Sequence, residues 1–219
     1  MFPSACFRDR ADAGRLLARA LREQLPPSDL HDALVLALPR GGVPVAYELA
    51  RDLHLPLDVF VVRKIGVPGQ PELAMGAIAS GGVIVTQPDV LRAYRIAQDT
   101  LHALAARERL EIERREALYR AGRPPLTLAG RTVILVDDGL ATGSTMMAAV
   151  RALRAHAHRI LVAVPVAAPV ICEEIAHTAD RVVCLHTPER FHAVGEFYRH
   201  FDQTTDEEVR ALLQSPPSP

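Results

Sequence analysis

The stretch from Arg131 to Thr145, RTVILVDDGLATGST, constrains the fold more than any other part of the chain. The residues from Thr132 to Val136 are apolar or β-branched, which is typical of a short strand buried on both faces. Asp137 and Asp138 follow, and the small residues 141–145 then lead into a predicted helix. A buried strand joined to a helix by a tight turn indicates an α/β fold.

This turn has the chemistry of an anion site. We call residues 141–145 the signature turn. Its small side chains leave backbone N–H groups and hydroxyls free to surround a phosphate at the positive end of the helix dipole. Asp137 and Asp138, just upstream, are placed to accept hydrogen bonds from a diol. Together these groups suit a ribose 5-phosphate. The plainer alternative is a strand–loop–helix joint with acidic N-capping, although capping requires only one aspartate.

Residues 133–145, VILVDDGLATGST, resemble the thirteen-residue phosphoribosyl pyrophosphate (PRPP) signature of type I phosphoribosyltransferases. Two other phosphate-binding motifs are excluded, because the turn lacks the Gly-Lys-Ser/Thr ending of a P-loop and no G-x-G-x-x-G follows a predicted strand. The resemblance implies that Asp137 and Asp138 are catalytic, holding the ribose hydroxyls and stabilising positive charge on the ring. It also implies that Gly139 binds substrate and that the signature turn binds the 5-phosphate through Ala141, Thr142, Gly143, Ser144 and Thr145.

A second turn of the same physical kind lies near the amino terminus. Residues 33–38 are predicted as a strand, which runs into Pro39-Arg40-Gly41-Gly42 and then a helix over 43–53. We call residues 39–42 the Gly-Gly turn. Taken alone, such a turn is more often a tight connection than a ligand site. In a parallel sheet, however, both turns would lie at the carboxyl ends of their strands, along one crevice. The resemblance then implies that Arg40, Gly41 and Gly42 receive the pyrophosphate.

Arg63 and Lys64 stand at the exit of the next predicted strand, residues 57–62. Lys64 is the only lysine among 25 basic residues. A lone ammonium suggests a site where the planar guanidinium cannot replace a compact charge, although one lysine can also survive by chance. Type I enzymes commonly place basic residues here, which implies that Arg63 and Lys64 reach the diphosphate of PRPP and that Lys64 is catalytic.

The region after Lys64 predicts a flap. Residues 66–82 hold seven Gly and Pro residues, too many for a helix, and the resemblance implies a flexible loop over about 65–86 that closes on the reaction centre. Within it, residues 77–80 and 83–86 are predicted to pair as a hairpin. Residues 89–120 are predicted as one long helix. Its Arg- and Glu-rich half is expected to face solvent, with a subunit contact or a lid as open alternatives.

The remaining alternation of strands and helices predicts a doubly wound, mostly parallel five-stranded sheet in one domain spanning 1–219. The other expected elements are helices over 8–25 and 170–177, strands over 160–164 and 181–185, a hood over about 186–205, a last helix capped by Thr205 and Glu208 and ending at Leu213, and a disordered tail over about 214–219.

The hood is rich in aromatic residues. Four of the ten Phe and Tyr residues of the chain lie between 191 and 201. One of them could stack on the planar ring of an acceptor, and Phe191 is the favoured candidate. Equally, these side chains could only seal the edge of the sheet.

Composition excludes several classes of protein. A net charge of -1 argues against a duplex nucleic-acid binder, so no nucleic-acid partner is expected. Three widely spaced cysteines indicate neither a disulfide framework nor a zinc site, and nine histidines show no metal-ligand spacing. No leader and no membrane-spanning run is expected, which favours a cytoplasmic protein.

The sequence therefore predicts an enzyme that transfers the ribose 5-phosphate of PRPP to a nitrogenous acceptor, such as a nucleobase, and releases pyrophosphate. Mg²⁺ is expected to bind mainly through PRPP, so no residue is assigned as a metal ligand. The alternative is a regulatory protein that senses PRPP or a nucleotide without efficient catalysis. A third is a scaffold subunit of a larger assembly. Type I enzymes are often dimers, so a homodimer is an open expectation, and the acceptor is not identified.

Overall fold

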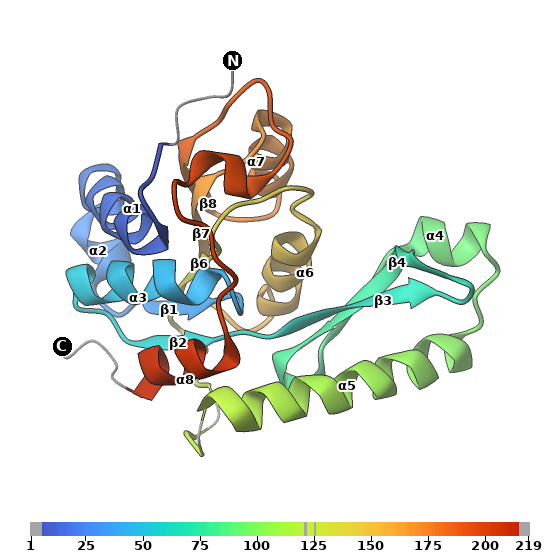
Figure 1. The fold of residues 1–219 in the computed structure, drawn as a ribbon. Coiled ribbons are helices and arrows are strands. Elements are labelled where there is room, and N and C mark those ends of the chain that lie inside the picture. Colours follow the sequence, from blue (N-terminus) through green and yellow to red (C-terminus); the bar gives the residue numbers. More distant parts are fainter. Residues whose placement is uncertain (1–5, 121, 125, 215–219) are drawn as a thin grey trace.

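The structure, a computed structural model, describes residues 6–120, 122–124 and 126–214. Helices cover both faces of a central sheet, and an arm projects from its side (Figure 1). The predicted disordered tail lies outside the described residues, except for Gln214, which ends the last helix.

The central sheet has five strands in the order β2-β1-β6-β7-β8, and each neighbouring pair is parallel. β1 lies beside β6, with Leu34 opposite Val133 and Ala37 opposite Val136. The Gly-Gly turn and the Asp137-Asp138 pair therefore leave adjacent strands at the same edge of the sheet. The predicted doubly wound parallel sheet is confirmed. Its strands are β1 (Leu34–Ala37), β2 (Leu57–Val59), β6 (Thr132–Val136), β7 (Arg159–Val166) and β8 (Arg181–His186).

Two layers of helices cover the sheet. Ile134 and Val136 of β6 face the first layer, whereas Val133 and Leu135 face the second. Burial on both faces explains why β6 is continuously apolar. The first layer contains α1 (Arg10–Gln24), the short α2 (Pro27–Leu30), α3 (Gly42–Leu53) and α8 (Asp206–Gln214), and the second contains α6 (Ser144–Leu153) and α7 (Pro169–Ala176).

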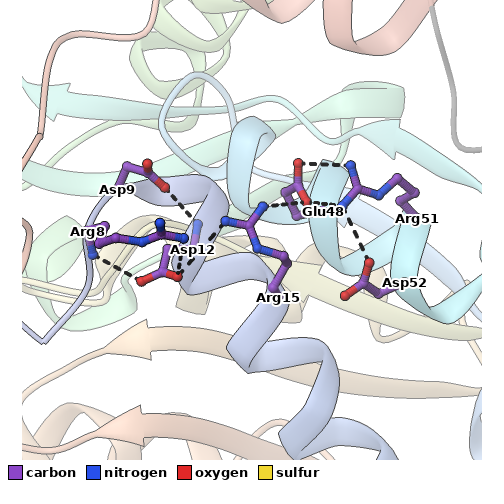
Figure 2. A network of polar contacts seen from close by, with 7 residues as sticks. All are labelled: Arg8, Asp9, Asp12, Arg15, Glu48, Arg51 and Asp52. Atoms are coloured by element: carbon purple, nitrogen blue, oxygen red, sulfur yellow. Dashed lines mark hydrogen bonds and ion pairs between the residues drawn. The ribbon is translucent and has the colours of Figure 1, made fainter.

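α1 is held closely against α3. Gly14 permits the approach, because a Cβ there would lie 2.4 Å from the carbonyl oxygen of Val45. Figure 2 shows the polar network across this contact, in which Arg15 donates to Glu48 at 3.0 Å and Arg51 donates to the same carboxylate. Asp9 caps α1 by accepting from the backbone N–H of Asp12 at 2.7 Å. The first turn of α1 is thus fixed relative to α3.

The arm is a three-stranded antiparallel sheet, in the order β3-β4-β5, packed on the long helix α5 (Figure 1). α5 runs back to the body, where Tyr119 donates to Asp206 of α8 at 2.5 Å and Arg120 pairs with Asp58 of β2 at 3.1 Å. The arm consists of β3 (Val62–Val67), β4 (Gln70–Ala79), the 3₁₀ turn η1 (Ser80–Gly82), β5 (Ile84–Thr86), α4 (Pro88–Ala93) and α5 (Gln98–Arg120). Its own apolar core contains Val61, Ile65, Val67, Met75, Ile78, Leu101, Ala105 and Ile112.

The arm corrects three sequence predictions. The strand predicted over 57–62 ends at Val59, and Val62 begins a strand of a different sheet. Residues 66–82, predicted as part of a flexible loop, are mostly the strand pair β3 and β4; Gly69 at its tip has φ +79°. The helix predicted over 89–120 is two helices, separated at residues 94–97. The hairpin predicted around Gly81 and Gly82 is confirmed as β4 and β5. Whether the arm moves stays a prediction.

No helix in the described part of the chain combines the length and the hydrophobicity that a membrane-spanning segment needs.

Candidate functional site

The two glycine-containing turns meet the aspartate pair at the carboxyl edge of the sheet. A Cβ on Gly41 would lie 2.1 Å from Oδ2 of Asp138. A Cβ on Gly42 would lie 2.7 Å from the carbonyl oxygen of Val136 and 2.9 Å from Cα of Asp137. Real Cβ atoms do not approach other atoms so closely, so any side chain here would displace the aspartates. The peptide bond between Pro39 and Arg40 is cis.

A cavity of about 420 Å³ lies between this contact and the hood. The structure therefore brings together four of the residues predicted from the sequence: Arg40, Gly41, Asp137 and Asp138. The cavity also has walls that were not predicted: Arg10 of α1, and Phe201, Gln203 and Thr204 of the hood.

Arg10 is the main functional residue that the sequence did not reveal. Its Nε donates to Oδ2 of Asp138 at 2.8 Å, and its Nη1 donates to the carbonyl oxygen of Asp202 at 2.7 Å. The guanidinium carbon lies 3.9 Å from the centre of the Phe201 ring, in cation–π contact. Tyr198 adds a further link, because its hydroxyl donates to the carbonyl oxygen of Asp138 at 2.6 Å. Asp138 is thus tied to α1 and to the hood.

The two aspartates have different electrostatic surroundings. Burial first, and then the charge of Asp138, raise the pKa of Asp137 well above its ordinary value; the Asp138 N–H, which donates to Oδ1 of Asp137 at 2.9 Å, opposes this. Burial also raises the pKa of Asp138, and the charge and hydrogen bond of Arg10 oppose that increase. Arg10 therefore favours the carboxylate form of Asp138, while ionisation of Asp137 would be favoured by positive charge entering the cavity.

A smaller cavity of about 160 Å³ lies over the signature turn and shares Asp137 with the first. It is lined by all of the predicted phosphate-binding residues: Gly139, Ala141, Thr142, Gly143, Ser144 and Thr145. The hydroxyls of Thr142 and Ser144 lie 3.0 Å apart. Gly143 caps α6 with φ +65°, a conformation that glycine adopts readily. Gly139 packs on the hood, since a Cβ there would lie 2.6 Å from Val194.

Lys64 lies on strand β3 of the arm. It lines a third cavity, of about 410 Å³, which includes Thr142, Gly143 and Ser144 and lies between the arm and α6. This cavity shares these three residues with the cavity over the signature turn, which in turn shares Asp137 with the cavity beside the Gly-Gly turn. Successive side chains of a strand point to opposite faces. Arg63 accordingly faces α5, where its Nε donates to Glu108 at 2.7 Å. The structure brings Lys64, but not Arg63, to these cavities.

Arg40 lines the cavity beside the aspartates and also contacts α8, whereas Phe191 lies outside all three cavities. Arg40 has its Nη1 3.6 Å from Oδ1 of Asp206, at the start of α8. Phe191 stacks on Phe197, with ring centres 5.5 Å apart and planes at 19°, and it lines none of the three cavities. Its packing fits the alternative in which hood aromatics seal the edge of the sheet. Phe201 is the aromatic residue that lines the cavity beside the aspartates.

The carboxylates of Asp137 and Asp138 fit a magnesium ion that arrives with a phosphorylated substrate. Mg²⁺ in such complexes uses one or two carboxylates together with substrate phosphates and water. Within the described ranges, no group of three or more His, Cys, Asp or Glu side chains is placed to hold a metal ion.

Comparisons with known proteins show the family of the chain. The family model described as the phosphoribosyl transferase domain matches residues 9–201. A Mycobacterium tuberculosis protein named "Putative phosphoribosyl transferase Rv0571c" is 48% identical over 208 residues. The match covers 94% of this chain and 46% of the relative, so the chain spans about half the length of that protein.

A solved structure supports the fold. The crystal structure of TT1426 from Thermus thermophilus is 48% identical, with a TM-score of 0.83, and the match covers 94% of this chain and 97% of that one. The resemblance inferred from the signature is confirmed, and the chain belongs to the phosphoribosyltransferase family.

Proposed function

We propose that this protein transfers the ribose 5-phosphate of PRPP to a nitrogen atom of a small acceptor, a nucleobase in the simplest case, and releases pyrophosphate. The observation that carries this proposal is the contact of the Gly-Gly turn with Asp137 and Asp138, in a cavity that shares Asp137 with the cavity over the signature turn. This arrangement offers adjoining sites for a diphosphate, a diol and a phosphate.

Different residues would bind the different parts of PRPP. Backbone N–H groups and hydroxyls of the signature turn would hold the 5-phosphate at the start of α6. Asp137 and Asp138 would accept hydrogen bonds from the ribose hydroxyls and stabilise the positive charge that develops at C1. Arg40 and the Gly-Gly turn would receive the pyrophosphate. The C1–N bond forms as the C1–O bond to pyrophosphate breaks, and the acceptor nitrogen loses its proton to solvent.

Magnesium bound to PRPP would neutralise part of the diphosphate charge and make pyrophosphate a better leaving group. Asp137 and Asp138 are the carboxylates that line the same cavity, so they are the residues that would contact such an ion.

A regulatory protein that binds PRPP or a nucleotide is the second candidate, and the position of Arg10 favours it. The guanidinium already covers the ring of Phe201 and pairs with Asp138. An acceptor that stacks on Phe201 would therefore have to displace Arg10 from that ring. A protein that holds this arrangement on binding PRPP would sense the sugar without transferring it.

Release of pyrophosphate tests both candidates. The protein is mixed with PRPP, Mg²⁺ and a panel of nucleobases and related nitrogen acceptors, and the pyrophosphate formed is measured. The double substitution of Asp137 and Asp138 by asparagine is the control, because it keeps the side-chain volumes and removes both charges. Release that depends on one acceptor and is lost in the control supports the enzyme. Binding of PRPP without release for every acceptor favours the regulator, and no binding of PRPP refutes the enzyme and a regulator that senses PRPP.

A further inference from the structure

Asp206 begins α8 directly behind the cavity that Arg40 lines. Its Oδ1 lies 3.6 Å from Nη1 of Arg40, and the same oxygen accepts from the hydroxyl of Tyr119 at 2.5 Å. The Gly-Gly turn, the end of α5 and the start of α8 therefore meet at one carboxylate. Thr204, two residues before Asp206, lines the cavity, whereas Asp206 does not. Asp206 thus lies next to the cavity, with the side chain of Arg40 between.

The two partners of Asp206 differ in how easily they can leave it. Tyr119 is 1% exposed, so loss of Asp206 would leave a buried hydroxyl without this acceptor, which is costly. The side chain of Arg40 is 37% exposed, and an ion pair as exposed as this one is weak. An anion that enters the cavity can therefore compete with Asp206 for Arg40, while Tyr119 keeps Asp206 in place.

Arg114 of α5 is a second cation near Asp206, and it interacts electrostatically with that carboxylate. Its guanidinium, however, donates to both carboxylate oxygens of Glu111, at 2.8 and 3.0 Å. Of these two cations, Arg40 is the one that lines the cavity and has Asp206 as its ion-pair partner. Asp206 therefore reduces the positive charge that Arg40 presents to a ligand.

We infer that Asp206 is a positioning residue that competes with the ligand for Arg40, and so weakens the binding of the pyrophosphate released in the proposed reaction. This inference rests on the proposed function and adds to it a residue outside the cavity. Its consequence is that pyrophosphate leaves more readily, because Arg40 can return to Asp206 as the product dissociates. Product release limits turnover in many enzymes, so such a residue would serve the reaction without touching the substrate.

Calorimetry with pyrophosphate and Mg²⁺ tests the inference. Asp206→Asn keeps the side-chain shape and an oxygen that can accept from Tyr119, but it removes the charge. Pyrophosphate should then bind about two- to fivefold more tightly, the range expected when an exposed ion pair no longer competes. Ribose 5-phosphate, which lacks the diphosphate, should bind with unchanged affinity. A merely structural role of Asp206 predicts weaker binding of both ligands or no change.

Matched variants separate the charge of Asp206 from its other contacts. Glu207→Gln removes an exposed charge from the next position of α8 and should change neither affinity. Tyr119→Phe breaks the hydrogen bond between α5 and α8 but leaves both charges, so it should not tighten pyrophosphate binding. Asp206→Glu keeps the carboxylate and should not tighten it either. Circular dichroism and thermal melts verify folding, and Asp206→Ser, which removes the same charge, is used if Asp206→Asn does not fold.

A double variant tests whether Arg40 transmits the effect. Arg40→Ala alone should weaken pyrophosphate binding, and adding Asp206→Asn to it should restore none of the loss. A gain in the double variant as large as the gain in the wild-type background would contradict the role of Arg40.

The inference is overturned if Asp206→Asn leaves pyrophosphate binding unchanged or weakens it, or if ribose 5-phosphate binding tightens equally. It is also overturned if Glu207→Gln or Tyr119→Phe tightens pyrophosphate binding as much as Asp206→Asn does. In each of these cases the wild-type chain still binds both ligands, so the proposed function stands. If the wild-type chain binds neither ligand and does not bind PRPP, the proposed function fails and the inference fails with it, which is a distinct result.

Discussion

The Gly-Gly turn and the signature turn both join a parallel strand to a helix, yet their glycines serve different purposes. Gly41 has an ordinary helical conformation, with φ -59°, and its missing Cβ makes room for Asp138. Gly143 has φ +65°, and a Cβ there would lie 2.5 Å from Cγ2 of Ile171 on α7. Glycine in the first turn therefore leaves room for the Asp138 carboxylate, whereas glycine in the second allows a left-handed backbone conformation and close packing against α7.

The largest expected effect comes from Gly42→Ala. The new methyl group would lie between the backbone of Val136 and that of Asp137, where no rotamer change can relieve the contact. We expect the free energy of unfolding to fall by about 1–3 kcal/mol. Because the aspartates must shift, turnover should fall by more than about 100-fold. Denaturant titration and pyrophosphate release measure the two quantities. Wild-type turnover in Gly42→Ala would show that the close contact is not needed for the reaction.

Arg10→Ala comes next and tests the electrostatic side of the same contact. Burial raises the pKa of Asp138 and Arg10 opposes the increase, so removing the guanidinium should raise that pKa further. If the carboxylate form is the active one, the acidic limb of the pH profile of turnover then moves to a higher pH than in the wild type. Loss of a charge-assisted hydrogen bond should also reduce turnover about tenfold. The pH profile of turnover tests this, and an unshifted acidic limb would contradict it.

Arg10→Lys is the control for that measurement. It keeps a positive charge near Asp138 but loses the planar group that lies on Phe201. The acidic limb of its pH profile should lie between the limbs of the wild type and of Arg10→Ala.

The smallest effect is expected in the signature turn, from Gly143→Ala. Alanine in the left-handed region costs about 1 kcal/mol, and the contact with Ile171 adds to this. The double variant with Ile171→Ala should recover the loss of stability that comes from the contact with Ile171. It should not recover the loss that comes from the left-handed backbone conformation. Turnover should change less than in Gly42→Ala, because the aspartates stay in place. Equal losses of turnover in the two glycine variants would remove the distinction between the turns.

The features that could be predicted from the sequence are those encoded by neighbouring residues. β6 is continuously apolar because both faces are covered, and the turn after it combines small residues with the start of a helix. The capping box at the start of α8 is equally local, since Oγ1 of Thr205 accepts from the N–H of Glu208 at 3.1 Å. Such patterns can be recognised without knowing where the rest of the chain lies.

The arm could not be predicted in the same way. Gly66 is a strand breaker by propensity, yet in β3 it lets Pro71 of β4 pack closely, because a Cβ on Gly66 would lie 2.5 Å from the carbonyl oxygen of Pro71. Pairing between β3 and β4 shifts register at this residue, as in a β-bulge. Propensity counts the glycines of this region as loop residues, because it does not include the partner strand.

The positions of Arg10 and of the hood aromatics in the site also could not be predicted from local sequence patterns. Arg10 and Asp138 are 128 positions apart, and nothing in the sequence distinguishes Arg10 from the other 23 arginines. Phe191 and Phe201 both lie in the aromatic cluster of the hood, but only packing decides that Phe191 stacks on Phe197 and that Phe201 borders the aspartates. A long-range partner is the missing information in each case.

The separate apolar core of the arm bears on how the molecule opens. Its buried residues, such as Met75 and Ile112, pack between the arm sheet and α5 and belong to neither core of the central sheet. We therefore expect the backbone amides of the arm to exchange their protons with solvent as one cooperative unit, with the contacts of Ala79 and Val85 to the second core of the central sheet broken in that opening. Hydrogen exchange would then report the arm and the sheet as two populations with different protection.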